Sequence, residues 1–231
     1  MDINSIIAEV EEFNKFERLL GATSAVFSCD YVTYVATLKC GSSFFTATIE
    51  KNLRWPKIDF KDIRWDNSHV FSLMLNPLTR RYKAITEWLY QKNLVNLFDK
   101  DPYFQKFVLN KPILDIHSYG YVYTYYEEYC QKIDWIPIDS VNSRDDVKKL
   151  VGLLFEKNKI DISDFWASND VANISPIHKK MFESKVKELF EENPSQEVLD
   201  YLAPDMELYS QVIAKFNPTG HSWDNISWLR K

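Results

Sequence analysis

The sequence predicts an α/β fold with a largely parallel central sheet flanked by helices. Short apolar segments rich in β-branched and aromatic residues alternate along the chain with longer segments of helical character. Strands made of such apolar segments are typical of a sheet covered by helices on both faces. With 231 residues the chain is long enough for one large domain and short for two, so we expect a single domain over residues 1–231.

Strands are predicted where apolar, β-branched and aromatic residues concentrate: 24–29, 31–38, 69–75 and 132–138. Asp30 lies between the first two segments and allows a turn there. The last segment leads into a loop at Asp139 and Ser140. The carboxyl ends of parallel strands open onto the ligand crevice of such a sheet, so the residues that follow each strand are candidates for a binding site.

Helices are predicted from amphipathic patterns and from their start and stop residues: 1–20, 43–53, 78–97, 101–109, 144–157, 176–193, 194–203 and 204–215. Asn76 lies where the third helix needs an N-cap, and Pro77 takes its first helical position. Pro194 and Pro204 mark the starts of the last two helices. The remaining stretches are predicted to be a loop over 115–123 and a carboxy-terminal tail over 216–231.

Composition and charge restrict the class of protein. The formal net charge is −5, whereas a general nucleic-acid binder is normally basic, so binding of DNA or RNA is not expected. Cys29, Cys40 and Cys130 are odd in number and lack the spacing of metal ligands, which favours a reducing compartment and a cytoplasmic location. The sequence shows no signal peptide, membrane-spanning segment or metal-ligand cluster, so neither a membrane nor a metal is expected.

A candidate phosphate-binding turn follows the second predicted strand. It reads Lys39-Cys40-Gly41-Ser42-Ser43 and leads into a predicted helix. Gly41 permits a tight turn, the helix start offers free N–H groups, and the lysine and serines add a charge and hydroxyl donors. The alternative is an ordinary strand-to-helix turn with a serine cap. A Walker A loop is absent, which disfavours an ATPase, a GTPase or a small-molecule kinase.

A second cationic turn follows the third predicted strand. The helix that begins after Asn76 carries Arg80, Arg81 and Lys83 in its first two turns. Cations near a helix amino terminus are unfavourable unless an anion meets them, so a second phosphate site is one interpretation. In the alternative interpretation Arg81 is solvated and Arg80 pairs with a surface acid.

Together, the two turns resemble the nucleotide-binding elements of PAPS-dependent sulfotransferases, in particular the carbohydrate sulfotransferase branch; PAPS is 3′-phosphoadenosine-5′-phosphosulfate. The segment from Lys39 to Ser43 matches the family's Lys-x-Gly-Ser/Thr-Ser/Thr loop. The segment that contains Arg80 matches the family's R-D-P-x-x-R-x-x-S pattern in part. Leu75 stands in place of the first arginine, and Lys83 replaces the serine.

Four later segments extend the resemblance over roughly residues 31–210: Asp115-Ile116-His117-Ser118, the strand that begins at Lys132, Asn173-Ile174-Ser175, and Asp205-Met206-Glu207-Leu208-Tyr209. The resemblance implies a P-loop-like sulfotransferase fold. It also implies transfer of the sulfuryl group from PAPS to a hydroxyl acceptor, with a carbohydrate as the acceptor class of that branch. A second reading is a catalytically weakened relative that binds a nucleotide or a protein partner.

The resemblance assigns a role to each site residue. Lys39 serves the sulfate and the leaving oxygen, and His117, oriented by Asp115, is the general base. The donor is held at its 5′-phosphate and 3′-phosphate by two sets of residues: Lys39, Cys40, Gly41, Ser42 and Ser43, and then Arg80 and Lys83. The scheme requires no metal. Without the resemblance, the favoured reading of His117 is a loop histidine bonded to backbone.

Six tyrosines lie close together in the sequence: Tyr119, Tyr121, Tyr123, Tyr125, Tyr126 and Tyr129. Their alternation predicts one face of a strand or extended loop. Two readings of this face remain open, a half-buried edge strand and a stacking surface for a sugar or an adenine.

Overall fold

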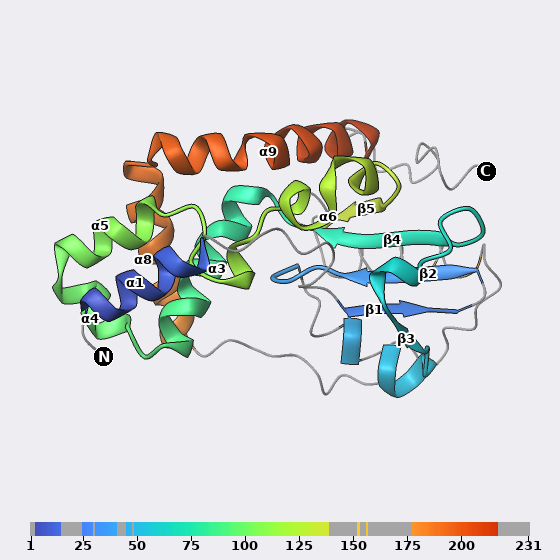
Figure 1. Cartoon of the computed structure of the whole chain (residues 1–231), viewed down its shortest axis with the longest axis horizontal. Coiled ribbons are helices and arrows are strands. Elements are labelled where there is room, and N and C mark those ends of the chain that lie inside the picture. Colours follow the sequence, from blue (N-terminus) through green and yellow to red (C-terminus); the bar gives the residue numbers. More distant parts are fainter. Residues whose placement is uncertain are drawn as a thin grey trace.

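The computed structural model describes residues 3–14, 25–29, 31–40, 45–47, 49–138, 152, 156 and 177–216. The structure is α/β, with a five-stranded mixed sheet and flanking helices (Figure 1). The strands are β1 (Ala25–Ser28), β2 (Val32–Ala36), β3 (Lys57–Ile58), β4 (His69–Met74) and β5 (Asp134–Pro137). The helices are α1 (Ile3–Phe13), α3 (Pro77–Gln91), α4 (Val95–Lys100), α5 (Pro102–Asn110), α6 (Tyr121–Cys130), α8 (Ile177–Glu192) and α9 (Gln196–Phe216).

The sheet has the order β3-β1-β2-β4-β5 and is mixed rather than largely parallel. Strands β2, β4 and β5 are parallel, as predicted, whereas β1 is antiparallel to both of its neighbours. Only Cys29, Asp30 and Tyr31 connect β1 to β2. A parallel pair needs a crossover of about a dozen residues or more, so this short connection makes a hairpin. The two-residue strand β3 was not predicted.

Buried side chains form two clusters. One surrounds the sheet and includes Tyr34, Phe71 and Tyr121, each fully buried. The other joins α1, α3, α4, α5, α8 and α9 around residues such as Trp88 and Phe104. Figure 1 shows the sheet at one end of the molecule, the helical cluster at the other, and α9 running along both. Helix α3 starts directly after β4 and therefore connects the sheet to the helical cluster.

The start of α3 is as predicted and its end is not. The Asn76 side chain accepts a hydrogen bond from the Leu78 amide at 2.9 Å, and Pro77 is the first helical residue. The helix predicted over 78–97 is two helices, because Asn93 has a φ of 56°, in the left-handed region that ends an α-helix. Helix α4 then begins at Val95.

The loop predicted over 115–123 is instead a short 3-10 helix (Ile116–Ser118) and the start of α6. The tyrosines predicted as a strand or extended loop are therefore mostly helical. Tyr121 and Tyr125 lie four residues apart and are both fully buried in the sheet core. Neither open reading describes these two tyrosines, because they lie on a helix instead of an edge strand and have no surface on which a ligand can stack.

The two helices predicted over 194–203 and 204–215 are one helix, α9, with Pro204 inside it. Buried residues on both sides of the proline keep one face of α9 against the rest of the protein: Val198, Leu202, Asp205, Leu208 and Val212. The predicted helix 43–53 is helical at 45–47 and π-helical at Ile49–Leu53.

Three predictions lie wholly or largely outside the described residues: the end of the helix over 1–20, the helix over 144–157 and the tail over 216–231, of which Phe216 is the last residue of α9. The same is true of Gly41, Ser42 and Ser43. None of the helices in the described ranges is long and apolar enough to cross a membrane.

Candidate functional site

The candidate site lies at the carboxyl ends of β2 and β4, which are parallel neighbours. Lys39 and Cys40 follow β2, and Arg80 belongs to the first turn of α3, which follows β4. The sequence predicted that these two turns share an edge of the sheet, and the strand pairing confirms it. The Asp115–His117 segment is brought to the same place, because the 3-10 helix Ile116–Ser118 packs against α3.

Arg80 connects the segments that carry the other candidate residues. Its Nε donates to the carbonyl oxygen of Leu38 at 3.0 Å, and its Nη1 donates to the carbonyl oxygen of Tyr119. The side chain is only 4% exposed, and the guanidinium lies 4.9 Å from the centre of the Tyr121 ring. Arg80 thus holds the loop after β2 and the loop before α6 against the start of α3.

Cys40 is part of the core that lies behind the site. It is fully buried, and its Sγ lies 3.1 Å from the hydroxyl of Tyr121, which also donates to the carbonyl oxygen of Leu75. Burial raises the pKa of the Cys40 thiol, so the group is a neutral packing residue and not a nucleophile. Leu75 is itself part of the sheet core, which gives a physical reason why an apolar residue replaces the arginine of the resembled pattern.

Lys39 makes an ion pair that the sequence did not predict. Its Nζ lies 3.0 Å from Oε2 of Glu87, and Nζ of Lys179 on α8 lies 2.7 Å from the same oxygen. Partial burial lowers the pKa of Lys39, while Glu87 and the more distant Asp115 oppose that shift. Burial alone would raise the pKa of Glu87, but hydrogen bonds from Lys179 and Lys39 outweigh burial and lower it to about 2.

Asp115 and His117 form the pair that the sequence predicted. Oδ2 of Asp115 lies 2.7 Å from Nδ1 of the imidazole, and Oδ1 accepts from the His117 amide at 2.9 Å. The side chains are 18% and 17% exposed. A carboxylate on Nδ1 fixes the ring orientation and favours the tautomer in which Nε2 accepts a proton. The geometry is that of an oriented base.

The remaining cations of α3 contact different parts of the chain. Arg81 is buried, not solvated, and donates to the carbonyl oxygens of Lys111 and Pro112. Burial lowers its pKa to about 10. Lys83 lies 3.2 Å from Glu183 of α8. Arg80 therefore binds carbonyl oxygens beside the site, while Lys83 is engaged with α8.

Asp205 is a buried residue whose role sequence reasoning missed. Its carboxylate, on α9, accepts from the amides of Tyr121 at 2.7 Å and Val122 at 2.9 Å, and so caps the start of α6. A Cβ on Gly120 would lie 2.7 Å from Oδ2 of Asp205, so any larger residue here would force the carboxylate to shift. The cap residue is distant in sequence from α6, which is why local signals predicted a loop there.

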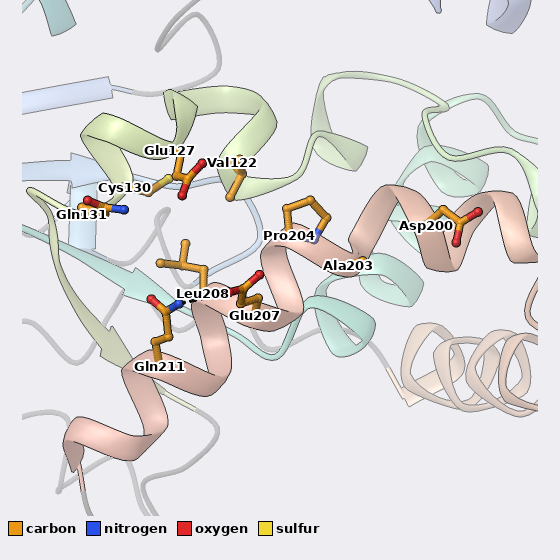
Figure 2. Close-up of a pocket in the computed structure, with 10 residues that line it drawn as sticks. All are labelled: Val122, Glu127, Cys130, Gln131, Asp200, Ala203, Pro204, Glu207, Leu208 and Gln211. Atoms are coloured by element: carbon orange, nitrogen blue, oxygen red, sulfur yellow. Dashed lines mark hydrogen bonds between the residues drawn. The ribbon is translucent and has the colours of Figure 1, made fainter.

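A cavity that the structure describes lies away from these residues. It has a volume of about 420 Å³ and lies between α6 and α9, lined by residues that include Glu127, Cys130, Glu207 and Gln211 (Figure 2). A neighbouring cavity of about 310 Å³ reaches the amino-terminal end of β5 at Asp134. Neither is lined by any of the site residues predicted from the sequence.

Comparison of the chain with models of protein families, with curated proteins and with solved structures gives no match in any of the three. The residues and the geometry of the site at the ends of β2 and β4 are therefore the basis for a proposed function.

Proposed function

We propose that the chain is a PAPS-dependent sulfotransferase of P-loop-like fold that acts on a hydroxyl acceptor, with carbohydrate as the acceptor class. The observation that carries the proposal is the grouping around Arg80. One buried guanidinium bonds both the segment that contains Lys39 and the segment that follows the Asp115–His117 pair. A cation for the leaving group and an oriented base are the two groups that metal-free sulfuryl transfer needs.

In this proposal His117 acts on the acceptor. Its Nε2 takes the proton of the hydroxyl while the hydroxyl oxygen forms a bond to the sulfur of PAPS. The bond between sulfur and the bridging oxygen breaks, and its electron pair stays on the 5′-phosphate of 3′,5′-ADP. Asp115 stabilises the imidazolium that results, since its carboxylate already contacts Nδ1.

Lys39 acts on the leaving group. Its ammonium group offsets the charge that develops on the bridging oxygen and donates a proton to it. The lowered pKa makes Lys39 a better proton donor than an ordinary lysine. Gly41, Ser42 and Ser43 are proposed to hold the 5′-phosphate through amides and hydroxyls, with Cys40 as the wall behind them. Arg80 and Lys83 are proposed for the 3′-phosphate, where Lys83 must exchange Glu183 for the ligand.

A second candidate function is nucleotide binding without transfer. The favouring observation is that the cations of the predicted 3′-phosphate site already have partners. Arg80 donates to two carbonyl oxygens, and Lys83 pairs with Glu183. Leu75, in the position of the family's first arginine, is in the core and supplies no charge.

A turnover experiment separates the two functions. The protein is incubated with PAPS labelled on sulfur and a panel of mono- and oligosaccharides, and both labelled product and 3′,5′-ADP are measured. If the chain is a sulfotransferase, the amount of 3′,5′-ADP formed should equal the amount of labelled, sulfated acceptor. A protein that binds 3′,5′-ADP but produces no sulfated acceptor from any member of the panel has the second function.

A further inference from the structure

We propose that Lys39 and Lys179 form one oxyanion-binding pair and that Glu87 is a built-in competitor for it, which a phosphate or sulfate group must displace. Lys179 is thereby a binding residue that neither sequence motif contains. The proposal deepens the proposed function and rests on it for the source of the oxyanion, namely the phosphosulfate end of the donor. The lysine pair itself rests on the geometry below.

Three separate elements bring these side chains together. Lys39 follows β2, Glu87 lies in the middle of α3, and Lys179 lies in the first turn of α8. Both ammonium groups contact Oε2 of Glu87, at 3.0 Å and 2.7 Å, while Oε1 accepts from Gln91 at 3.0 Å. The three charged side chains are 19–23% exposed, so the cluster is partly buried yet reachable from solvent.

The charge of this cluster does not balance. Among the residues that the structure describes, two ammonium groups share a single carboxylate oxygen, so these three charged groups leave one positive charge over. Asp115 is the other acid that acts on Lys39, and its carboxylate is already bonded to His117. The phosphosulfate end of the donor, like inorganic sulfate or a terminal phosphate, carries about two negative charges and several acceptor oxygens, so it can satisfy both lysines at once.

The position of Lys179 supports the same conclusion. It is the third residue of α8, where a cation opposes the helix dipole and so needs an anion beside it, a place that Glu87 takes in the free protein. Lys39 is held with a φ of 66°, a left-handed conformation that is uncommon for a residue other than glycine. Two residues in unfavourable settings thus direct their ammonium groups to one point.

Replacement of Glu87 by an oxyanion depends on the charge of the oxyanion and not on changes of pH near neutrality. Because the pKa of Glu87 is about 2, its carboxylate is ionised at neutral pH. A singly charged anion such as chloride is attracted to the two lysines little more strongly than the carboxylate is. A multivalent oxyanion is attracted more strongly, because it also neutralises the positive charge that the carboxylate leaves over. Once displaced, Glu87 keeps the hydrogen bond from Gln91 and gains access to solvent.

The test is a set of titrations with inorganic sulfate, 5′-AMP and 3′,5′-ADP on four proteins: wild type, Glu87→Gln, Lys179→Met and the double variant. Glu87→Gln removes the competitor and keeps the shape and an acceptor for Gln91. We expect it to tighten binding of all three probes by roughly five- to tenfold. Lys179→Met should weaken all three, and the double variant should bind less tightly than Glu87→Gln alone.

Two exposed residues of α8 supply matched controls. Glu188→Gln makes the same charge change as Glu87→Gln, and Lys180→Met the same change as Lys179→Met, both outside the cluster. These controls should leave all three affinities within about twofold of wild type. If Glu188→Gln tightened binding as much as Glu87→Gln, net charge alone would account for the effect and the competitor role would be wrong.

Other outcomes separate this proposal from the proposed function. Tighter sulfate binding by Glu87→Gln, together with no preference for 3′,5′-ADP over 5′-AMP, supports the lysine pair and contradicts the sulfotransferase. A clear preference for 3′,5′-ADP, together with unchanged affinities in Glu87→Gln, supports the sulfotransferase and contradicts the competitor role of Glu87. Absence of sulfate binding in both wild type and Glu87→Gln overturns the lysine pair. A double variant equal to Glu87→Gln would mean that Lys179 only holds Glu87 and does not touch the anion, which contradicts its role as a binding residue.

Discussion

Nε of Arg80 donates to the carbonyl oxygen of Leu38 at 3.0 Å, which ties the start of α3 to the residue before Lys39. The same guanidinium bonds the carbonyl oxygen of Tyr119, two residues after His117. Arg80 is therefore placed to fix the distance between the proposed leaving-group cation and the proposed base. Sulfuryl transfer depends on such in-line positioning, because small misplacements of reacting groups are costly.

Arg80→Lys should lower stability and activity together. Lysine keeps the charge but lacks the planar fork that reaches two carbonyl oxygens, so at least one buried carbonyl loses its donor. We expect a loss of about 1–3 kcal/mol in the free energy of unfolding, measured by denaturant titration. Arg64→Lys, at an exposed position, is the control and should change it by less than about 0.5 kcal/mol. Equal stability of the two variants would contradict the connecting role of Arg80.

Lys39→Met should abolish sulfuryl transfer and leave the fold intact. The side chain is partly exposed and its ion pair with Glu87 adds little stability, about 1 kcal/mol or less. Lys61→Met, on the surface, is the control. In the wild type the active form of Lys39 is the protonated ammonium, so the rate should fall as the pH rises through the pKa of this lysine. That pKa lies below the ordinary lysine value of 10.5. Transfer that survives in Lys39→Met removes this lysine from the mechanism.

His117→Ala should lower the maximal rate by about 10²–10⁴-fold and leave the affinity for 3′,5′-ADP nearly unchanged. The reason is that a base acts on the acceptor in the transition state and not on the donor. His178→Ala, at an exposed position of α8, is the control. The opposite pattern, lost affinity with a retained rate, would make His117 a donor-binding residue.

Gly120→Ala should destabilise the protein through its contact with α9. The new Cβ would lie 2.7 Å from Oδ2 of Asp205, so the cap on α6 must move. Overpacking of this kind costs about 1–3 kcal/mol. Asp205→Asn should cost a comparable amount, because an amide accepts from only one of the two capped N–H groups and presents its own donors to the other. Asp200→Asn, one turn earlier and exposed, should have little effect.

Glu87 should make stability sensitive to acid. Its pKa in the folded protein is about 2, below the ordinary 4.5, so its contribution is fully present above about pH 4.5 and is lost as the pH falls towards 2. Because the carboxylate is partly exposed, we expect the contribution to be only about 1 kcal/mol. Denaturant titrations from pH 2 to 6 should therefore give a flatter profile for Glu87→Gln than for wild type. Parallel profiles would contradict this ion-pair cluster.

Local signals in the sequence predicted the elements that local interactions determine. The cap by Asn76 and the start of α3 at Pro77 are confirmed, as are the four apolar strands, because neighbouring residues dictate each of them. The meeting of the two cationic turns also followed from sequence, since parallel strands place their carboxyl ends together.

Several of the failed predictions depend on residues far apart in the chain. Helix α6 begins where a carboxylate of α9 caps it, and no local signal near Gly120 announces Asp205. Glu87 and Lys179 were missed for the same reason, because their partner Lys39 lies on another element. The position of Glu87 seven residues after Arg80 places both on one face of α3, which is the one clue that the sequence offered.

The most direct test of the proposed function is calorimetric titration of the wild-type protein with 3′,5′-ADP and with 5′-AMP. The two ligands differ by the 3′-phosphate, which is the group that marks a PAPS site. We expect 3′,5′-ADP to bind more tightly by about tenfold or more, which is the effect of one hydrogen bond to a charged group, and Lys83→Met to reduce this preference. Equal affinities for the two ligands, or no binding of either, would contradict the assignment of this protein as a PAPS-dependent sulfotransferase.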